Sequence, residues 1–261
     1  MTTLDTGPQG PTLGRPADAD RQPGRRVQEP GLTILVLAKT PHPGRSKTRL
    51  APRFGFHGAA QLAAAALADT LDAVAAAPAT RRVLVLDGVV VPPVPRGMEV
   101  VPQSPGGHAE RIAAALAAVR GPALLIGMDT PQVTPELLTL DLADPAPQAW
   151  LGLAADGGWW ALGLRAAARY AHQVLDSVPM STSSTGAVQR RRLLTAGLAV
   201  ADLPVLRDVD EPQDADAVAA LAPGTRFAAT VRRLDRGHGP SPAGSRTAFG
   251  AGNPSLTGNP R

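Results

Sequence analysis

The chain has 261 residues, no cysteine, 3% aromatic residues and a formal charge of +4 from 26 basic and 22 acidic side chains. The lack of cysteine excludes disulfides, thiolate metal sites and a cysteine nucleophile. Few aromatic residues and a nearly neutral middle of the chain argue against nucleic acid as a partner. No signal peptide or apolar run of membrane-spanning length is evident, so we expect a cytoplasmic protein with no membrane span.

Both ends of the chain differ in composition from its middle. Residues 1–30 are rich in Pro, Gly, Asp and Arg, and residues 226–261 carry six basic residues and one acidic residue. Segments of this kind bury too little apolar surface to fold alone, so we expect two disordered tails, the second of them basic. The folded body is expected to be a single domain over residues 31–225.

The first predicted element is a short buried strand followed by a basic loop. Ile34–Ala38 is continuously apolar, as in a strand covered on both faces of a parallel sheet. Prolines and Gly44 prevent its continuation, and the loop carries the only lysines of the chain, Lys39 and Lys47, together with Arg49. Ligands of open α/β sheets bind at the carboxyl ends of strands, so this loop suits phosphate groups. A solvated basic turn is the alternative.

The pattern then predicts a helix over Gly58–Ala77, a strand over Arg82–Asp87, a short strand over Met98–Val101 and a helix over Ala109–Val119. A glycine-bearing loop precedes the last of these helices and brings Gln103 and Arg111 to its entrance. Free backbone N–H groups at such an entrance can hold an anion or a ribose. The same charges also fit the ordinary surface of a first helical turn.

A second strand of the fully buried type, Pro122–Gly127, leads directly into Asp129. A carboxylate immediately after a core strand is a common way to hold a divalent ion between protein and phosphates. The alternative is a turn or capping role, because a short helix is expected to open at Thr134.

Two further strands, Ala149–Ala155 and Trp159–Leu164, are predicted on either side of Asp156-Gly157-Gly158. Asp-Gly is a strong hairpin signal, which makes Asp156 a turn residue in the simplest interpretation. Paired glycines equally allow a ligand to approach the backbone closely. Both interpretations remain open from the sequence.

The last predicted elements are a helix over Gly186–Ala196, a strand over Leu198–Leu206 and a helix over Pro212–Leu221. Asp208 and Asp210 lie between the final two. Carboxylates at positions i and i+2 of an extended chain lie on one side and can share a cation. The alternative is that this acidic cluster caps the helix that follows.

Five motifs, in chain order, resemble a bacterial family of GT-A-type glycosyltransferases associated with radical-SAM or selenodomain proteins. They are AKTPHPGRSKTRL, QxxGxxxER, IGMDTP, AADGGWWALGL and RDVDEPQD, and the resemblance covers about residues 32–222. The family is distantly related to the guanylyltransferases of molybdenum-cofactor and deazaflavin-cofactor synthesis. The resemblance implies an α/β fold with a Rossmann-like, mostly parallel sheet flanked by helices, as in nucleotide-diphosphosugar transferases. DGGW and DVDEP replace the family's DGGY and DVDTP, which affects the expected acceptor more than the nucleotide.

The resemblance also implies roles for individual residues. The nucleotide phosphates would lie on Lys39, Gly44, Lys47 and Arg49, and Gln103 and Arg111 complete the candidate nucleotide-binding set. Mg²⁺ or Mn²⁺ would be held by Asp129 together with Asp208 or Asp210. The candidate catalytic residues are Lys47, Asp129 and Asp156, of which Asp156 would border the sugar or acceptor pocket.

The function expected from these residues is metal-dependent glycosyl transfer from a nucleoside-diphosphate sugar to an unidentified small-molecule acceptor. The alternative is guanylyltransferase-like transfer from a nucleoside triphosphate with release of pyrophosphate, which uses the same cation and the same basic loop. A third hypothesis is a nucleotide-binding module that has inherited the fold without the chemistry. The sequence does not separate the first two.

Overall fold

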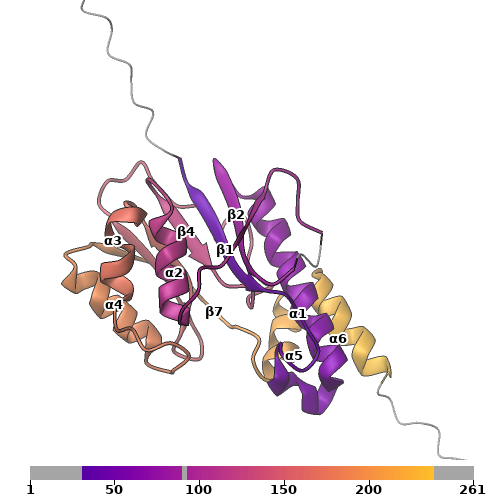
Figure 1. The fold of residues 1–261 in the computed structure, drawn as a ribbon. Coiled ribbons are helices and arrows are strands. Elements are labelled where there is room, and N and C mark those ends of the chain that lie inside the picture. The colour runs from indigo at the N-terminus through magenta and orange to yellow at the C-terminus, as the bar shows by residue number, and fades with distance from the viewer. Residues whose placement is uncertain (1–30, 90–92, 238–261) are drawn as a thin grey trace, which may run out of the picture.

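The computed structural model describes residues 31–89 and 93–237, and Figure 1 shows them as one open sheet flanked by helices. The expected tail at residues 1–30 lies outside this range. Seven strands form the sheet in the order β3-β2-β1-β4-β6-β5-β7. They are β1 (Thr33–Lys39), β2 (Arg81–Asp87), β3 (Glu99–Pro102), β4 (Ala123–Ile126), β5 (Ala149–Ala154), β6 (Trp159–Leu164) and β7 (Val200–Leu206).

Six of the seven strands run in the same direction, so their carboxyl ends lie at one edge of the sheet. Pairing is parallel between β1 and β2, β1 and β4, β2 and β3, and β5 and β7. By contrast, β6 runs antiparallel to both β4 and β5. The carboxyl ends of the parallel strands therefore share one edge, which we call the carboxyl edge. This confirms the Rossmann-like, mostly parallel α/β sheet predicted from the sequence.

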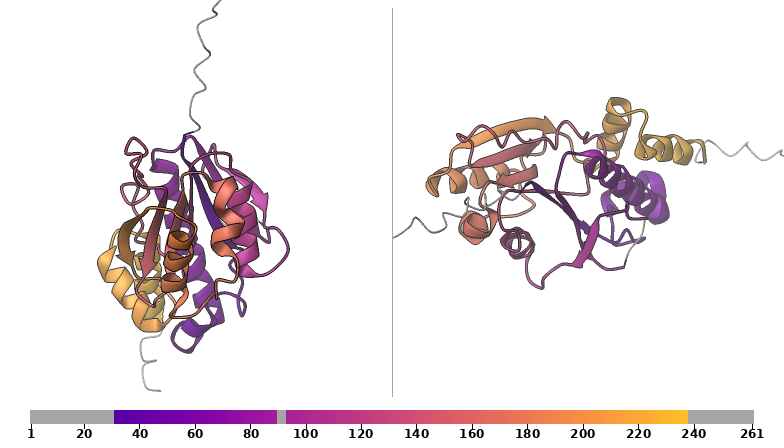
Figure 2. Two further views of the ribbon diagram at one scale, coloured as in Figure 1. Left: turned by 90° about the vertical axis from the view of Figure 1, so that its left-hand side faces the viewer. Right: turned by 90° about the horizontal axis from the view of Figure 1, so that it is seen from above.

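Helices cover both faces of the sheet (Figure 2). The helices of the described residues are η1 (Thr48–Leu50), α1 (Ala51–Ala76), α2 (His108–Ala117), α3 (Ala167–Leu175), α4 (Thr185–Thr195), α5 (Pro212–Leu221) and α6 (Arg226–Gly237). Ile34 of β1 lies in a core shared with α1, whereas its neighbour Leu35 lies in a core shared with α2, α3 and α4. Both faces of β1 are thus buried. This explains why its sequence is continuously apolar and does not alternate between apolar and polar residues.

Local differences from the sequence prediction have identifiable causes. Helix α1 begins at Ala51, before the predicted start at Gly58, and is interrupted at Gly55, whose φ is 67°. The short helix expected at Thr134 is replaced by turns, in which Leu138 and Thr139 donate backbone hydrogen bonds to the carbonyls three residues earlier. Helix α3 was not predicted, because a nine-residue helix leaves only a short apolar pattern.

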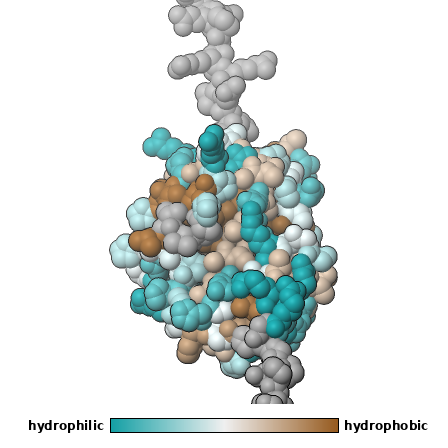
Figure 3. Space-filling model, turned by 90° about the vertical axis from the view of Figure 1, so that its right-hand side faces the viewer, coloured by the Kyte–Doolittle hydropathy of each residue, from teal (hydrophilic) through white to brown (hydrophobic). Residues whose placement is uncertain are grey.

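Thr48–Ala76, which includes η1 and α1, is long and apolar enough to cross a membrane by length and composition alone. This differs from the prediction that no apolar run reaches membrane-spanning length. However, 56% of its most apolar window is buried inside the protein. Helix α1 packs on the sheet with one side and on α6 with another. The outer surface on this side is mainly hydrophilic or pale, with brown limited to small patches (Figure 3). Burial in the core accounts for the apolar composition of α1.

Helix α6 corrects the C-terminal boundary of the folded body. Residues 226–237 were assigned to a disordered tail, but they form a helix that packs on α1. Phe227 and Val231, one helical turn apart, are 1% and 4% exposed. Many arginines surround this short apolar stripe, so the average composition of the segment does not indicate a buried helix. Residues 238–261 lie outside the described range.

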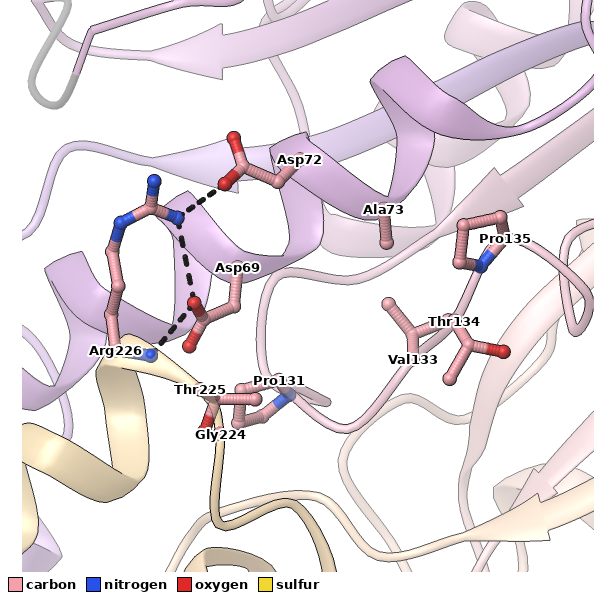
Figure 4. A pocket seen from close by; sticks show the side chains of 10 residues that line it. All are labelled: Asp69, Asp72, Ala73, Pro131, Val133, Thr134, Pro135, Gly224, Thr225 and Arg226. Atoms are coloured by element: carbon pink, nitrogen blue, oxygen red, sulfur yellow. Dashed lines mark hydrogen bonds and ion pairs between the residues drawn. The ribbon is translucent and has the colours of Figure 1, made fainter.

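Phe227 and Val231 belong to an apolar group that we call the C-terminal cluster. It includes Leu50, Phe54, Leu62, Val209, Val218, Phe227 and Val231. Polar contacts fix the start of α6 beside it: the backbone N–H groups of Arg226 and Phe227 donate to the Asp69 carboxylate of α1 at 3.0 and 2.8 Å. The Arg226 guanidinium also pairs with Asp69 and Asp72 (Figure 4). Asp69 therefore supplies the hydrogen bonds that the first turn of α6 lacks.

Candidate functional site

Residues that follow different strands meet at the carboxyl edge. The Lys47 Nζ atom, in the loop after β1, lies 3.0 Å from Oδ2 of Asp129, which follows β4. The same atom lies 2.8 Å from Oδ1 of Asp210, which follows β7. The basic loop thus converges with two aspartates that lie far from it in the sequence, as the strand pattern predicted.

The chain holds Lys47 in an uncommon conformation. Its φ and ψ are 48° and 44°, in the left-handed region that non-glycine residues rarely adopt. Ser46, 1% exposed, accepts a hydrogen bond from the His42 backbone N–H at 3.0 Å and closes the turn before it. Burial lowers the pKa of the Lys47 ammonium, but Asp129 and Asp210 raise it by more, so the pKa is above its ordinary value. Lys47 is therefore a fixed positive charge.

Three carboxylates form a group next to Lys47. Oxygen atoms of Asp156, Asp208 and Asp210 lie within 4.8 Å of one another. Burial, with the negative charge of Asp156 and Asp210, raises the pKa of Asp208 to about 6. Burial also acts to raise the pKa of Asp210, but Lys47 and Arg49 outweigh it and the pKa is lowered. Hard oxygen donors with unbalanced negative charge suit Mg²⁺ or Mn²⁺, so the donor set fits a divalent cation.

The metal set implied by the resemblance is only partly gathered. Asp208 and Asp210 lie together, but their third partner is Asp156, whereas the Asp129 carboxylate pairs with Lys47. The Asp129 carbonyl accepts the backbone N–H of Val209 at 3.0 Å and so ties the segment after β4 to the segment after β7. The sequence analysis did not place Asp156 among the metal ligands. Its position after a buried strand, like that of Asp129, was the available signal.

The Asp-Gly-Gly segment forms the predicted β5–β6 hairpin turn and also carries Asp156 into the acidic group. The Gly158 backbone N–H donates to Oδ1 of Asp156 at 2.8 Å, which orients the carboxylate. The Gly157 carbonyl accepts the N–H of Gly186, at the start of α4, at 2.8 Å. Gly157 has a φ of 91°, and a Cβ at this position would lie 2.0 Å from the Ser183 carbonyl oxygen. Only glycine fits there, and the backbone that approaches it closely is that of Ser183. The hairpin-turn interpretation is therefore confirmed, and the approach of a ligand to these glycines stays a prediction.

Replacing Gly157 with alanine is expected to destabilise the protein by about 2–4 kcal/mol, because backbone strain and a steric clash add. Gly197→Ala is the matched control, since its φ is 76° but a Cβ would meet no atom within 4 Å. The control should cost only about 1 kcal/mol from strain alone. Urea unfolding of both variants measures the difference, and equal losses would contradict the close packing of this turn on the loop before α4.

Gln103 and Arg111 brace the carboxyl edge. The Gln103 side-chain amide donates to the carbonyls of Ala38 and Val85 at 2.7 and 3.2 Å, which joins the ends of β1 and β2. Arg111 donates to the Asp87 carboxylate at 3.1 Å and to the Gly106 carbonyl at 2.8 Å. Both side chains already have protein partners, so their contribution to any ligand site includes holding the loop before α2 in place.

The remaining residues of the basic loop are open to solvent. Arg49 is 69% exposed, and its guanidinium lies 3.6 Å from Asp210 and 3.8 Å from Glu211. Gly44 has a φ of 74°, and a Cβ there would meet no atom within 4 Å. The Lys39 side chain is exposed at the end of β1 and lowers the pKa of Asp210 through space. Arg49 and Lys39 therefore present positive charge to solvent near the ion pairs of Lys47.

His108, at the first position of α2, lies near Asp129 and Arg111, and no role is predicted for it from the sequence. Burial, Arg111 and Lys39 lower its pKa, and Asp129 opposes them in part. The lowered pKa favours the neutral imidazole over the imidazolium and places a polar side chain next to the charged ones.

A shallow pocket of about 600 Å³ lies elsewhere, between α1, residues 131–135 and the start of α6 (Figure 4). Its lining includes Asp69, Asp72 and Arg226 and none of the candidate site residues. Arg226 pairs with both aspartates, so the charged side chains that line the pocket are engaged with one another. The chemistry of the carboxyl edge, and not the volume of this pocket, defines the candidate site.

Comparisons with known proteins support the fold. Residues 60–182 match the family model DUF2064, described as an uncharacterized protein conserved in bacteria. No curated protein matches the sequence. A candidate nucleotide-diphospho-sugar transferase from Desulfovibrio desulfuricans has a similar structure, with a TM-score of 0.69 and 24% identity, over 78% of this chain and 95% of that one.

Two nucleotidyltransferase structures are more distantly similar. CMP:2-keto-3-deoxy-manno-octonic acid synthetase, complexed with CTP, has a TM-score of 0.47 and 14% identity over 74% of this chain and 98% of that one. The 2-C-methyl-D-erythritol 4-phosphate cytidylyltransferase of Thermus thermophilus has a TM-score of 0.45 and 17% identity over 73% and 98%. The likeness to the Desulfovibrio structure shows that this chain has the fold of a nucleotide-diphospho-sugar transferase.

Proposed function

We propose that this protein is a metal-dependent glycosyltransferase that transfers a sugar from a nucleoside diphosphate to a small-molecule acceptor. One observation carries the proposal: a buried ammonium, Lys47, lies between Asp129 and Asp210 and next to a group of three carboxylates at the carboxyl edge. Positive charge from the protein and a site for a divalent cation are side by side, as recognition of a diphosphate requires. The fold supports the same conclusion.

The basic residues would bind and stabilise the diphosphate. Lys47 and Arg49 supply fixed positive charge where the leaving diphosphate gains negative charge, and Lys39 adds a third cation at the end of β1. Charge placed in advance at such a position stabilises a transition state by several kcal/mol. Gly44 lets the backbone approach the phosphates closely. Gln103 and Arg111 would hold the loop before α2 against the nucleotide.

Asp208 and Asp210, with Asp156 or Asp129, would hold Mg²⁺ or Mn²⁺. When bound, the cation supplies Lewis-acid neutralisation of the diphosphate. Asp156 lies in the hairpin turn that packs on the loop before α4, and on this side of the cation site it would orient an acceptor hydroxyl. The exposed turn and the polar residues before α4 leave this side open to an acceptor.

Nucleotidyl transfer from a nucleoside triphosphate is the second candidate. The observation in its favour is the number of cations in one short loop, where Lys39, Arg45, Lys47 and Arg49 all lie within the same turn region. A triphosphate carries more negative charge than a diphosphate sugar, and four cations suit it. In that reaction a substrate phosphate would attack the α-phosphorus and pyrophosphate would leave.

The released product distinguishes the two reactions. The full chain is incubated with Mn²⁺ and either nucleotide sugars or nucleoside triphosphates, first with water and then with hydroxyl-bearing and phosphate-bearing acceptors. Nucleoside diphosphate among the products supports glycosyl transfer, and pyrophosphate supports nucleotidyl transfer. Nucleotide binding that needs no divalent cation, with neither product, would instead indicate a non-catalytic binding module.

Replacing Asp129 with alanine is expected to abolish Mn²⁺-dependent nucleotide binding, because the Lys47 ammonium loses a partner and the cation site loses a carboxylate. The measurement is the rise in melting temperature with nucleotide and Mn²⁺, since a ligand that binds the folded state stabilises it by mass action. Asp176→Ala, at an exposed position after α3, is the control and should keep the full rise. An undiminished rise in the Asp129 variant would remove Asp129 from the site.

A further inference from the structure

The Asp210 carboxylate has two competing uses. Its Oδ1 atom accepts a hydrogen bond from the Lys47 ammonium at 2.8 Å. It is also one of the three carboxylates that lie within 4.8 Å of one another and fit a divalent cation. An ammonium and a divalent cation on the same carboxylate repel each other, so each lowers the affinity of that carboxylate for the other.

Lys47 cannot simply leave this position for water. Its side chain is only 11% exposed, and its backbone is fixed in the left-handed region just before η1. Leu50, three residues later, is fully buried in the C-terminal cluster. Without Asp210 the buried ammonium would keep only Asp129 as a partner. Losing one of two anionic partners is costly for a buried charge, so Lys47 gives up Asp210 only when another anion takes its place. The exposed guanidinium of Arg49 and the exposed Lys39 lie on the side from which an anion would approach.

We propose that Lys47 is a gate for the metal: its ammonium blocks Asp210 and Asp129 in the ligand-free protein and releases Asp210 when a diphosphate arrives. The metal and the diphosphate then bind with positive cooperativity, because the anion removes the ammonium that competes with the cation. By linkage, the metal strengthens diphosphate binding by the same factor. The inference rests on the proposed function, since it assigns to this site a preference for the metal–diphosphate complex over either component alone.

The test measures Mn²⁺ affinity of the full chain with and without inorganic pyrophosphate, with no nucleotide and no turnover. Free Mn²⁺ is followed by its EPR signal, and its association with pyrophosphate is measured separately in buffer. For the wild-type protein, pyrophosphate is expected to tighten Mn²⁺ binding by about tenfold, a typical coupling between two ligands. If pyrophosphate does not tighten it, the gate is ruled out without reference to any variant.

The matched variants are Lys47→Met and Lys39→Met. Each removes one positive charge that acts on Asp210, but only Lys47 contacts its carboxylate. Lys47→Met is expected to bind Mn²⁺ alone about tenfold more tightly than the wild type and to show no further gain with pyrophosphate. Lys39→Met should show a smaller gain with Mn²⁺ alone, and pyrophosphate should still tighten Mn²⁺ binding, although less than in the wild type because Lys39 is one of the diphosphate-binding cations. Equal behaviour of the two variants would overturn the gate and leave only a general effect of charge.

The outcome is independent of the transfer reaction. A protein that releases neither nucleoside diphosphate nor pyrophosphate from donors can still show the coupling between Mn²⁺ and pyrophosphate, and then only the proposed function fails. Conversely, transfer activity together with uncoupled binding of Mn²⁺ and pyrophosphate removes the gate and leaves the proposed function intact.

Discussion

Asp210→Asn is expected to weaken Mn²⁺ binding by at least about 100-fold. Asp210 belongs to the three-carboxylate group and also pairs with Lys47 and Arg49. The amide has nearly the same shape but no charge, so the cation loses its strongest donor while the fold is retained. Isothermal titration of Mn²⁺, with and without nucleotide, measures the effect.

Asp87→Asn is the control for Asp210→Asn. Asp87 ends β2 at the same edge, is 57% exposed and pairs with Arg111, but it lies outside the three-carboxylate group. Its replacement should change Mn²⁺ affinity by less than about threefold, as expected for a screened surface charge. Similar losses in both variants would mean that the cation responds to the total charge of the edge and not to ligation by Asp210.

Phe227→Ala is expected to destabilise the protein by about 3–5 kcal/mol, the range found when a fully buried phenylalanine is truncated in a core. Its ring is 1% exposed, within the C-terminal cluster. For a domain of this size such a loss lowers the melting temperature by about 10 °C. Thermal unfolding followed by circular dichroism measures it.

Leu221→Ala is the control for Phe227→Ala, because Leu221 ends α5 with its side chain 70% exposed. Its truncation should cost less than about 0.5 kcal/mol, as is usual for a surface position. A melting temperature unchanged by Phe227→Ala would show that α6 does not pack on α1 in solution. The original assignment of these residues to a tail would then be restored.

The sequence predicted the sheet well because a strand that is covered on both faces leaves a short, unbroken apolar run. Ile34–Ala38 and Arg82–Asp87 were recognised in this way, and β1 and β2 cover them. Proline and glycine then marked where each strand ends, and parallel strands place those ends together. These two facts place the Lys47 loop and Asp129 at the same edge, and the family resemblance added Asp210 to them.

Other parts of the molecule depend on contacts that no local pattern contains. Asp156 joins Asp208 because β6 runs antiparallel between β4 and β5, which places the hairpin turn at the carboxyl edge. A dipeptide such as Asp-Gly predicts the turn but not the neighbour of that turn. Similarly, α6 is stabilised by Asp69 and by the C-terminal cluster, both supplied by residues far away in the chain. Composition alone therefore misassigned it.

The C-terminal cluster has a consequence for biosynthesis. It contains Leu50, three residues after Lys47, and Val209, which separates Asp208 from Asp210. Phe227 and Val231, near the end of the described chain, complete it. A nascent chain whose residues 226–237 are still inside the ribosome thus lacks the support of both halves of the edge. We expect this edge to acquire its final packing only after α6 has been synthesised, later than the strands that form the sheet.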